Sequence, residues 1–368
     1  MRFIILGFLL MGMACTSEPK KQTTSERIES IPSLTPTLIK SVSQIDDFYF
    51  GYLGLNSITT VDESILLPVF HPASIIKTDK SLTTVITETI KGRGPGEVQD
   101  VGVPSYFEER VVVYDQMQDR YSVFDTDLNL IREAFPPKGN YSMYEVYAST
   151  DSINLVFTKG RAYGNREINS TNLFLYNFDT EKLEHSLGII GRLQAPIGKS
   201  INGRFGSWIY LPFGVKQLIS ESETAGRLWL FDTQTTEIAE VNQSFDTLRT
   251  ITVELPTEDV TTEEVDEFIK HEDGENNYLD VESEERIRNA FPKTKAVADK
   301  MIVKNQQIWL KSNLSGPTQL WFVLNMEGEI EYKVHLPNNG MVTHVSDDHI
   351  GVRIDDSTFG LFTNPLIK

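Results

Sequence analysis

The stretch Lys91-Gly-Arg-Gly-Pro-Gly-Glu97 decides how this chain folds. Its three glycines and one proline within seven residues are incompatible with the interior of a helix or a strand. Glycine permits positive φ and proline restricts φ, and both properties suit tight turns. The Lys-Ser/Thr pair of a P-loop is missing and no helical pattern follows, which argues against a phosphate-binding loop. The stretch therefore predicts a turn between two β-units, with Arg93 and Glu97 as candidates for a binding mouth.

Short runs of alternating apolar residues fill most of the chain after residue 37. Such runs, rich in Val, Ile, Phe, Tyr and Trp, are typical of strands. Clear examples are 64–69, 110–115, 121–125, 153–157, 173–177, 227–232, 307–310 and 320–325. Most of them are not separated by a helical pattern long enough for a βα unit, which argues against a parallel α/β sheet.

Five of these runs end in an apolar residue followed by Asp or Asn, then a polar turn and another strand. The five tips are Asp79, Asp125, Asn177, Asn242 and Asn325. We interpret them as turn residues whose side chains accept hydrogen bonds from backbone N–H groups. A repeated unit of roughly 45–50 residues with four strands is typical of a propeller blade.

The repeat predicts an all-β fold, a six-bladed β-propeller with four-stranded antiparallel blades over residues 37–368. The last blade, from Met341 to Thr363, has only three strands of its own. We expect the segment Thr37–Ser43 to supply the fourth as an outer strand, which would close the ring and remove open sheet edges.

The glycine-rich turn between short hairpins resembles the signature turn of the six-bladed β-propeller lipoproteins, TolB-like and NHL-like, that are common in Bacteroidota. The resemblance covers roughly residues 37–368. It implies an architecture and carries no established activity with it.

The N-terminus predicts export and lipid attachment. Met1-Arg2 is a short basic start, residues 3–13 are apolar apart from two glycines, and Ala14-Cys15 follows. Such a segment is a secretory signal, too short to span a membrane as a helix. The small residue before a lone cysteine resembles the bacterial lipobox, although Gly12 stands where leucine is usual. We expect a signal peptide over 1–14, acylation of Cys15, a flexible tether over 15–36, and a location in the cell envelope. The alternative is an ordinary signal peptide with a chance cysteine.

The overall charge limits the partners. The chain has 34 basic and 52 acidic residues and a formal net charge of −18. Because nucleic-acid binding relies on cationic contacts to phosphate, nucleic acid is not expected as a partner. The single cysteine excludes an intrachain disulfide. The sequence indicates no cofactor.

Residues 256–295 interrupt the β pattern with an acidic helical insertion. Thr261 and Glu264 form a capping box, and Val265, Phe268 and Ile269 form one apolar stripe. A second helix is expected over 282–290. The insertion holds thirteen acids and five bases. It is either a decoration packed on the blades or an acidic lid over basic loops, which would compete with an anionic ligand.

Four long segments fall on the same face of the predicted propeller, where loops usually carry binding sites. These segments are 91–97, 159–170, 190–213 and 256–295. The first three carry eight basic residues and two acids. Their basic and aromatic residues suit a ligand site. The candidate ligand-binding residues are Arg93, Glu97, Arg161, Tyr163, Arg166, Arg204 and Trp208. The predicted function is a membrane-tethered binding module for a ligand or an envelope protein.

A metal-dependent propeller enzyme of the lyase or lactonase type is the alternative function, and an envelope scaffold is a third. His71 lies in a predicted loop that could face the channel mouth. His344 and His349 flank Asp347-Asp348, but the blade order places them on the opposite face from His71. Serine catalysis has no support, because the chain has no GxSxG motif.

Overall fold

The computed structural model describes residues 24–54, 58–59, 63–102, 104–107, 109–136, 141–149, 155–162, 170–198, 207–274 and 279–367. The predicted signal peptide and Cys15 lie outside these ranges. No helix within them is both long enough and apolar enough to cross a membrane.

The described chain is organised in β-sheets, most of which are formed by strands that follow one another in sequence. One sheet contains β5 (Tyr52–Leu53), β6 (Ile58–Thr59), β7 (Ile65–His71), β8 (Ala73–Thr78) and β9 (Val85–Glu88). The next contains β10 (Ser105–Phe107), β11 (Arg110–Asp115), β12 (Arg120–Asp125) and β13 (Leu130–Ala134). It is followed by β14 (Tyr141–Ser149), β15 (Leu155–Ala162), β16 (Ser170–Asn177) and β17 (Lys182–Ile190).

Two further sheets have the same organisation. The first contains β20 (Gln217–Glu221), β21 (Leu228–Asp232), β22 (Glu237–Val241) and β23 (Thr247–Thr252). The second contains β24 (Ala298–Lys304), β25 (Gln307–Ser312), β26 (Thr318–Leu324) and β27 (Ile330–Pro337). Two small hairpins stand apart, β3 (Gln44–Ile45) with β4 (Phe48–Tyr49) and β18 (Gln194–Ile197) with β19 (Ser207–Tyr210).

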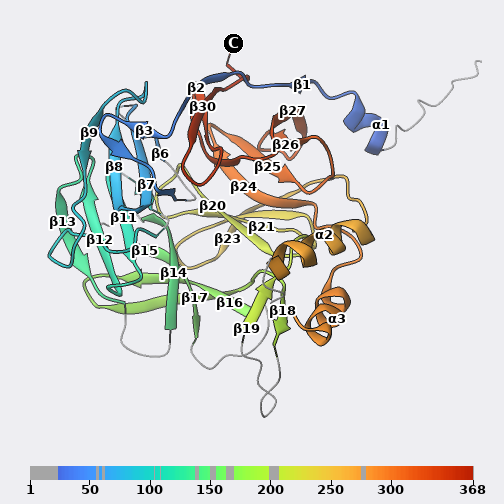
Figure 1. Ribbon diagram of the computed structural model, residues 1–368, viewed down its shortest axis with the longest axis horizontal. Coiled ribbons are helices and arrows are strands. Elements are labelled where there is room, and N and C mark those ends of the chain that lie inside the picture. Colours follow the sequence, from blue (N-terminus) through green and yellow to red (C-terminus); the bar gives the residue numbers. More distant parts are fainter. Residues whose placement is uncertain are drawn as a thin grey trace, which may run out of the picture.

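The sheets surround a common centre, so the fold is a β-propeller (Figure 1). An apolar cluster lies between each sheet and its neighbour. One cluster joins Leu66 to Val111, and another joins Phe231 to Phe322. The ring is closed by the cluster that joins Phe359 back to Ile65. Face-to-face packing of neighbouring sheets thus holds the propeller together, which explains why the sequence reads as apolar strands without crossover helices.

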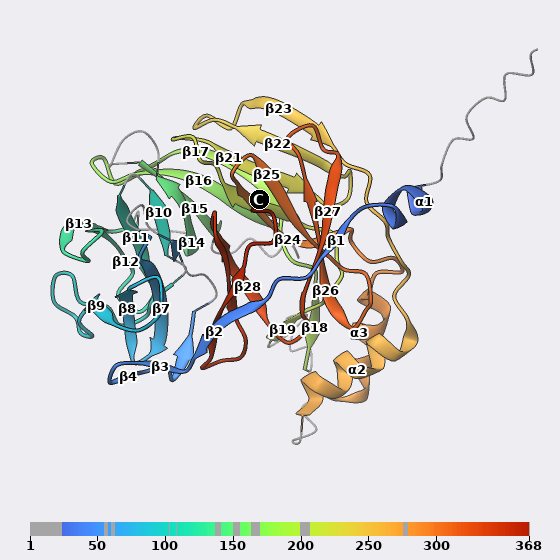
Figure 2. The same cartoon turned by 90° about the horizontal axis from the view of Figure 1, so that it is seen from above.

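The expectation of six equivalent blades is met only in part. Five blades are built from consecutive strands. The remaining sheet combines β28 (Met341–Val345), β29 (His349–Arg353) and β30 (Phe359–Thr363) with β2 (Leu38–Val42) from the other end of the chain. β2 pairs antiparallel with β30, which confirms that the segment Thr37–Ser43 adds an outer strand (Figure 2).

The expectation of a flexible tether over residues 15–36 is wrong for its second half. Helix α1 (Thr24–Glu29) and strand β1 (Ser33–Leu34) lie against the blade of β24–β27. β1 pairs parallel with β27, so this blade is not purely antiparallel. Ile28 and Leu34 join apolar clusters of the ring. Lys333 Nζ also donates to the carbonyl oxygen of Ile28 (3.0 Å), so both apolar contacts and hydrogen bonds attach the segment to the blade.

The five Asp and Asn tips act as predicted. Asp79 Oδ1 accepts from the backbone N–H groups of Thr83 (2.6 Å) and Thr84 (2.7 Å). Asn325 Oδ1 accepts from the N–H groups of Glu327 and Glu329, both at 3.0 Å. Asp125, Asn177 and Asn242 make equivalent bonds. These side chains close the turns between the outer strands of their blades.

Candidate functional site

The glycine-rich turn is held tightly by its neighbours. The carboxylate of Glu97 accepts from the N–H group of Gly94 (2.7 Å), and a Cβ at Gly92 would lie 1.9 Å from that same carboxylate. Arg120, which is buried, donates to the carbonyl oxygens of Gly94 (2.8 Å) and Glu97 and pairs with Glu133 (2.8 Å). Gly92 and Gly94 thus leave room for the side chain of Glu97, which folds back over the turn, and Gly96 has a positive φ of 73°. Arg93 is exposed at its surface.

The structure places few of the other predicted ligand-binding residues. The backbone of Arg161 lies in β15, but its side chain is outside the described part of the molecule. Tyr163, Arg166 and Arg204 also lie outside the described residues. Trp208 is described and lies exposed on β19.

The acidic insertion packs on the β18–β19 hairpin. It forms α2 (Thr262–Asp273) and α3 (Val281–Ala290), and both predicted helices are confirmed. The capping box is also confirmed, since the Thr261 side chain accepts from the N–H group of Glu264 (3.2 Å) and the Glu264 carboxylate accepts from that of Thr261 (3.0 Å). Ile269 of the predicted stripe is buried in one cluster with Ile287 and Ala195. Apolar contacts thus attach the insertion to the hairpin, and Figures 1 and 2 show α3 beside β18.

Ion pairs of the insertion run within the insertion itself. Arg288 pairs with Asp266 (2.5 Å), and Arg286 pairs with Glu282 (2.9 Å). Arg286 also donates to the carbonyl oxygen of Gly198 (2.8 Å) in the hairpin. In the part of the chain that is described, the packing therefore agrees with a fixed insertion rather than with a loosely held electrostatic lid.

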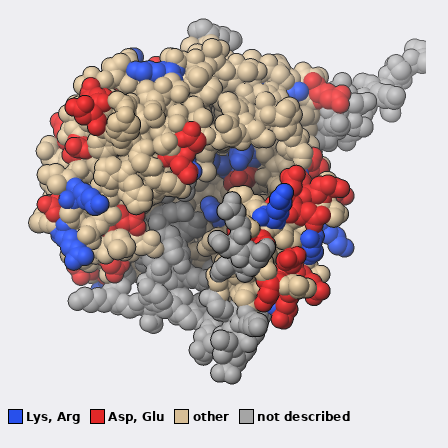
Figure 3. All heavy atoms as spheres, in the orientation of Figure 1, with Lys and Arg blue, Asp and Glu red and all other residues tan. Residues whose placement is uncertain are grey.

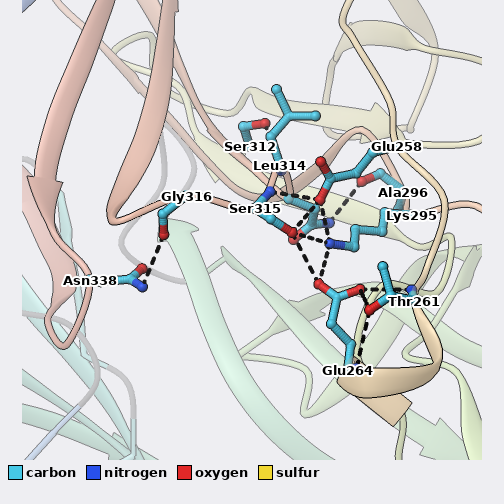
Figure 4. Close-up of polar contacts among 11 residues, drawn as sticks. Glu258, Thr261, Glu264, Lys295, Ala296, Ser312, Leu314, Ser315, Gly316 and Asn338 are labelled. Carbon is cyan, nitrogen blue, oxygen red and sulfur yellow. Dashed lines mark hydrogen bonds and ion pairs between the residues drawn. The ribbon is translucent and has the colours of Figure 1, made fainter.

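A buried lysine joins the two ends of the insertion to the neighbouring blade (Figure 4). Lys295 Nζ lies between the carboxylates of Glu258 (2.5 Å) and Glu264 and also donates to Ser315 Oγ (2.7 Å). It stands 4.7 Å from the centre of the Phe213 ring. Burial alone would raise the pKa of Glu258, but hydrogen bonds from Lys295 and Ser315 hold it below its usual value. We call these residues the Lys295 clasp.

A second cluster lies four residues further along the chain, where β24 begins. Asp299 is flanked by Lys216, just before β20, and by Lys311 on β25 (3.5 Å). Burial alone would raise the pKa of Asp299, but the two ammonium groups lower it to about 2. The carboxylate is therefore ionised at neutral pH.

This lysine pair carries a net positive charge, because two ammonium groups share one carboxylate. The side chains remain accessible: Lys216 is 17% exposed, Lys311 31% and Asp299 39%. β20 and β24 begin and β25 ends at this position, so the cluster lies at the end of the ring that carries the hairpin and the insertion. Figure 3 shows basic and acidic side chains set back in a hollow on the face that it presents.

Another titratable group lies at the opposite end of β20. Glu221 accepts a hydrogen bond from Ser105 Oγ (2.5 Å). This bond links β20 to β10, the first strands of two blades that are not neighbours in the ring. Burial raises the pKa of Glu221 to about 7, although the Ser105 hydrogen bond and the charge of Lys304 act in the opposite direction. Such a carboxyl group changes charge near neutral pH, but it is remote from the lysine pair along the strand.

Within the described residues, the histidines do not come together as the metal site that a propeller enzyme would need. His344 and His349 flank the turn between β28 and β29, with ring centres 5.1 Å apart, and His349 Nδ1 contacts Asp348 (2.5 Å). His71 is the last residue of β7 and is exposed. Within the described ranges, no group of three or more His, Cys, Asp or Glu side chains is arranged to hold a metal ion.

The lysine pair was not predicted from the sequence. Lys216 and Asp299 are 83 residues apart, and neither belongs to a recognisable motif. The available signal was weak: Asp299 and Lys300 are adjacent charges near the start of an apolar strand. A charged residue in that position of an inner strand faces the end of a propeller, where ligand sites are common.

The comparisons with known proteins bear on the fold through one solved structure. No family model matches the chain, and no curated protein matches it. Among solved structures, a member of the DUF4221 family from Bacteroides vulgatus aligns with a TM-score of 0.51 and 10% identity, over 89% of this chain and 97% of that one. BamB from Moraxella catarrhalis aligns with a TM-score of 0.38 and 9% identity, over 89% of this chain and 99% of that one. At such identity, the first likeness supports the propeller fold and nothing about activity.

Proposed function

We propose that this chain is a binding module of the bacterial cell envelope, which holds a ligand with an anionic group at Lys216 and Lys311. The observation that carries the proposal is the sharing of one carboxylate, Asp299, by two partly exposed ammonium groups. Asp299 neutralises one of the two charges and keeps both side chains in place. A carboxylate or phosphate that approaches the pair meets the remaining charge in a site from which water is partly excluded.

The surroundings of the lysine pair support a site of fixed geometry. Met301 and Leu310, on the same strands as Asp299 and Lys311, are buried in the apolar cluster between the two blades. The Lys295 clasp holds the chain immediately before Asp299. The strands fix the backbone positions of the two lysines, and Asp299 holds their ammonium groups, so little ordering is needed when a ligand binds.

The proposal extends to the whole chain. We infer that the sheet of β2 and β28–β30 serves as the sixth blade of a closed ring. Residues 1–14 are proposed as a signal peptide and Cys15 as the lipid attachment point, with the tether shortened to 16–23 because α1 follows. Several acyl chains on one cysteine would anchor the module stably. The other predicted ligand contacts remain predictions, namely Arg93, Glu97, Arg161, Tyr163, Arg166, Arg204 and Trp208.

Binding of citrate and inorganic phosphate to the soluble domain tests the site. A ligand that binds only the folded state raises its unfolding temperature as its concentration increases. We expect that rise to disappear in the double variant Lys216→Met/Lys311→Met and to grow in Asp299→Asn, which frees both lysines. Lys304→Met is the matched control, because Lys304 lies at the other end of β24 and pairs with Glu223 (2.9 Å). Equal stabilisation of all four proteins would refute the site.

Membrane attachment is tested separately with the full chain. Cys15→Ser should release the protein from the membrane fraction or block its processing. A variant that is processed as before and still sediments with membranes would contradict lipid anchoring, whatever the result of the anion experiment.

A further inference from the structure

The β18–β19 hairpin has two chemically different faces. Along a strand, successive side chains point to opposite faces. Ala195 and Ile197 of β18 and Ile209 of β19 lie on the face that packs against the helices of the insertion. Trp208 and Tyr210 alternate with Ile209 and are 39% and 56% exposed. One face of the hairpin is therefore part of the protein core, and the other carries two partly exposed aromatic rings.

The exposed face also carries polar and cationic groups. The register places Gln194 opposite Tyr210 and Pro196 opposite Trp208. The Arg192 guanidinium lies 5.7 Å from the centre of the Tyr210 ring, so it covers part of the aromatic surface. We call Arg192, Gln194, Pro196, Trp208 and Tyr210 the aromatic face.

We propose that the aromatic face binds an acidic glycan, which deepens the proposed binding function by naming a ligand class. Trp208 and Tyr210 are two residues apart on one strand, and their Cα atoms are therefore separated by roughly 7 Å. Two rings at this spacing can stack on the C–H faces of neighbouring sugar rings. The Gln194 amide can bond to sugar hydroxyl groups, and the Arg192 guanidinium can pair with a sugar carboxylate.

Charge complementarity favours an acidic glycan over a neutral glycan or an apolar peptide. The connection 190–213, from which the hairpin is built, contains three basic residues and no acid, although the whole chain has a net charge of −18. The same connection leads into Lys216, which is one member of the lysine pair.

Calorimetry with oligogalacturonides and with their methyl esters tests the inference. We expect the acid form to bind, and the ester to bind at least about tenfold more weakly because it lacks the charge that Arg192 recognises. Trp208→Ala and Tyr210→Ala should each weaken binding by about tenfold, as is usual for aromatic residues at the centre of a site. Tyr49→Ala is the matched control, since Tyr49 is 67% exposed on the separate β3–β4 hairpin.

Tyr210→Phe guards against a folding artefact, because it keeps the ring and should keep most of the affinity. Failure of oligogalacturonides to bind, or equal binding of the esters, would overturn the inference. Loss of binding in Lys216→Met/Lys311→Met with full binding in Trp208→Ala would also overturn it, while leaving the lysine pair as an anion site. Citrate binding that persists without any oligogalacturonide binding would show that only the glycan inference has failed.

Discussion

Replacing Lys295 should detach the helical insertion from the ring. The Lys295 side chain is 2% exposed, and its one ammonium group pairs with both Glu258 and Glu264, which keep exposures of 33% and 23%. Lys295→Met preserves an unbranched apolar side chain beside Phe213 but leaves two carboxylates without their cation. Loss of one partner from a buried ion pair typically costs about 3–5 kcal/mol. Because water still reaches both carboxylates, we expect about 2–3 kcal/mol here.

Hydrogen exchange measures this loss locally. If the insertion opens separately from the blades, a loss of 2–3 kcal/mol speeds amide exchange in α2 and α3 by about 30–150-fold. Amides in β25 and β26 should change little, because apolar packing holds those strands. The effect should differ little between low and high salt, since ions screen a buried pair weakly.

Two variants make the experiment specific. Lys293→Met removes the same charge from an exposed position two residues earlier and should leave exchange unchanged. Adding Glu258→Gln and Glu264→Gln to Lys295→Met should restore protection, because no uncompensated charge remains. Unchanged exchange in Lys295→Met would refute this reasoning and assign the attachment to the apolar stripe alone. Loosening of the wild-type insertion by salt would instead favour the electrostatic lid.

Three further predictions concern stability. Burial holds the pKa of His344 well below 6.5, so as pH drops below 6.5 the imidazole is protonated in the unfolded chain before it is protonated in the folded one, and the unfolding free energy should fall. In His344→Gln the urea midpoint should depend less on pH over that range, and an equal pH dependence in both proteins would contradict the prediction. Glu221→Gln should stabilise the fold above pH 7 by about 1–2 kcal/mol. Burial raises the pKa of the wild-type carboxyl group to about 7, so above that pH a charge forms inside the folded protein. An unchanged unfolding free energy in a urea titration at pH 8 would argue against this. Deleting residues 16–23 should leave the unfolding temperature unchanged, whereas deleting 16–35 should lower it by a few degrees because Ile28 and Leu34 leave their apolar clusters. Deleting 16–45 should lower it sharply because β2 is lost, and equal unfolding temperatures of the last two variants would refute the closing role of β2.

Local patterns predicted the features that depend on short stretches of chain. The Thr261–Glu264 capping box marked the start of α2, and the positions of Val265, Phe268 and Ile269 identified the side of that helix that packs. The Asp and Asn tips marked the turns, since each side chain bonds to backbone groups within five residues. The three strands expected over 341–363 predicted that residues 37–43 would add an outer strand to their sheet, and β2 pairs with β30.

Other features could not be decided from the sequence, because they depend on contacts between distant segments. The segment 24–34 is polar enough to resemble a tether, and only the outer strand β27 shows that it has a partner. The acidic insertion and the basic loops had opposite net charges, which favoured a lid. The structure shows that Glu258, Glu264 and Asp266 pair with bases of the insertion itself, and charge counts cannot reveal such pairing.

The sequence by itself determined the class of the fold, its turns, its helical insertion and the use of an N-terminal strand. These properties follow from residue periodicity and from backbone preferences, which act over a few residues. Only the tertiary structure decided where charge collects at the end of the ring. Lys216 directly precedes β20, whereas Asp299 and Lys311 lie on β24 and β25, and the three residues meet because these two consecutive blades pack face to face. The exposure of Trp208 and Tyr210 likewise depends on which face of their hairpin the insertion covers.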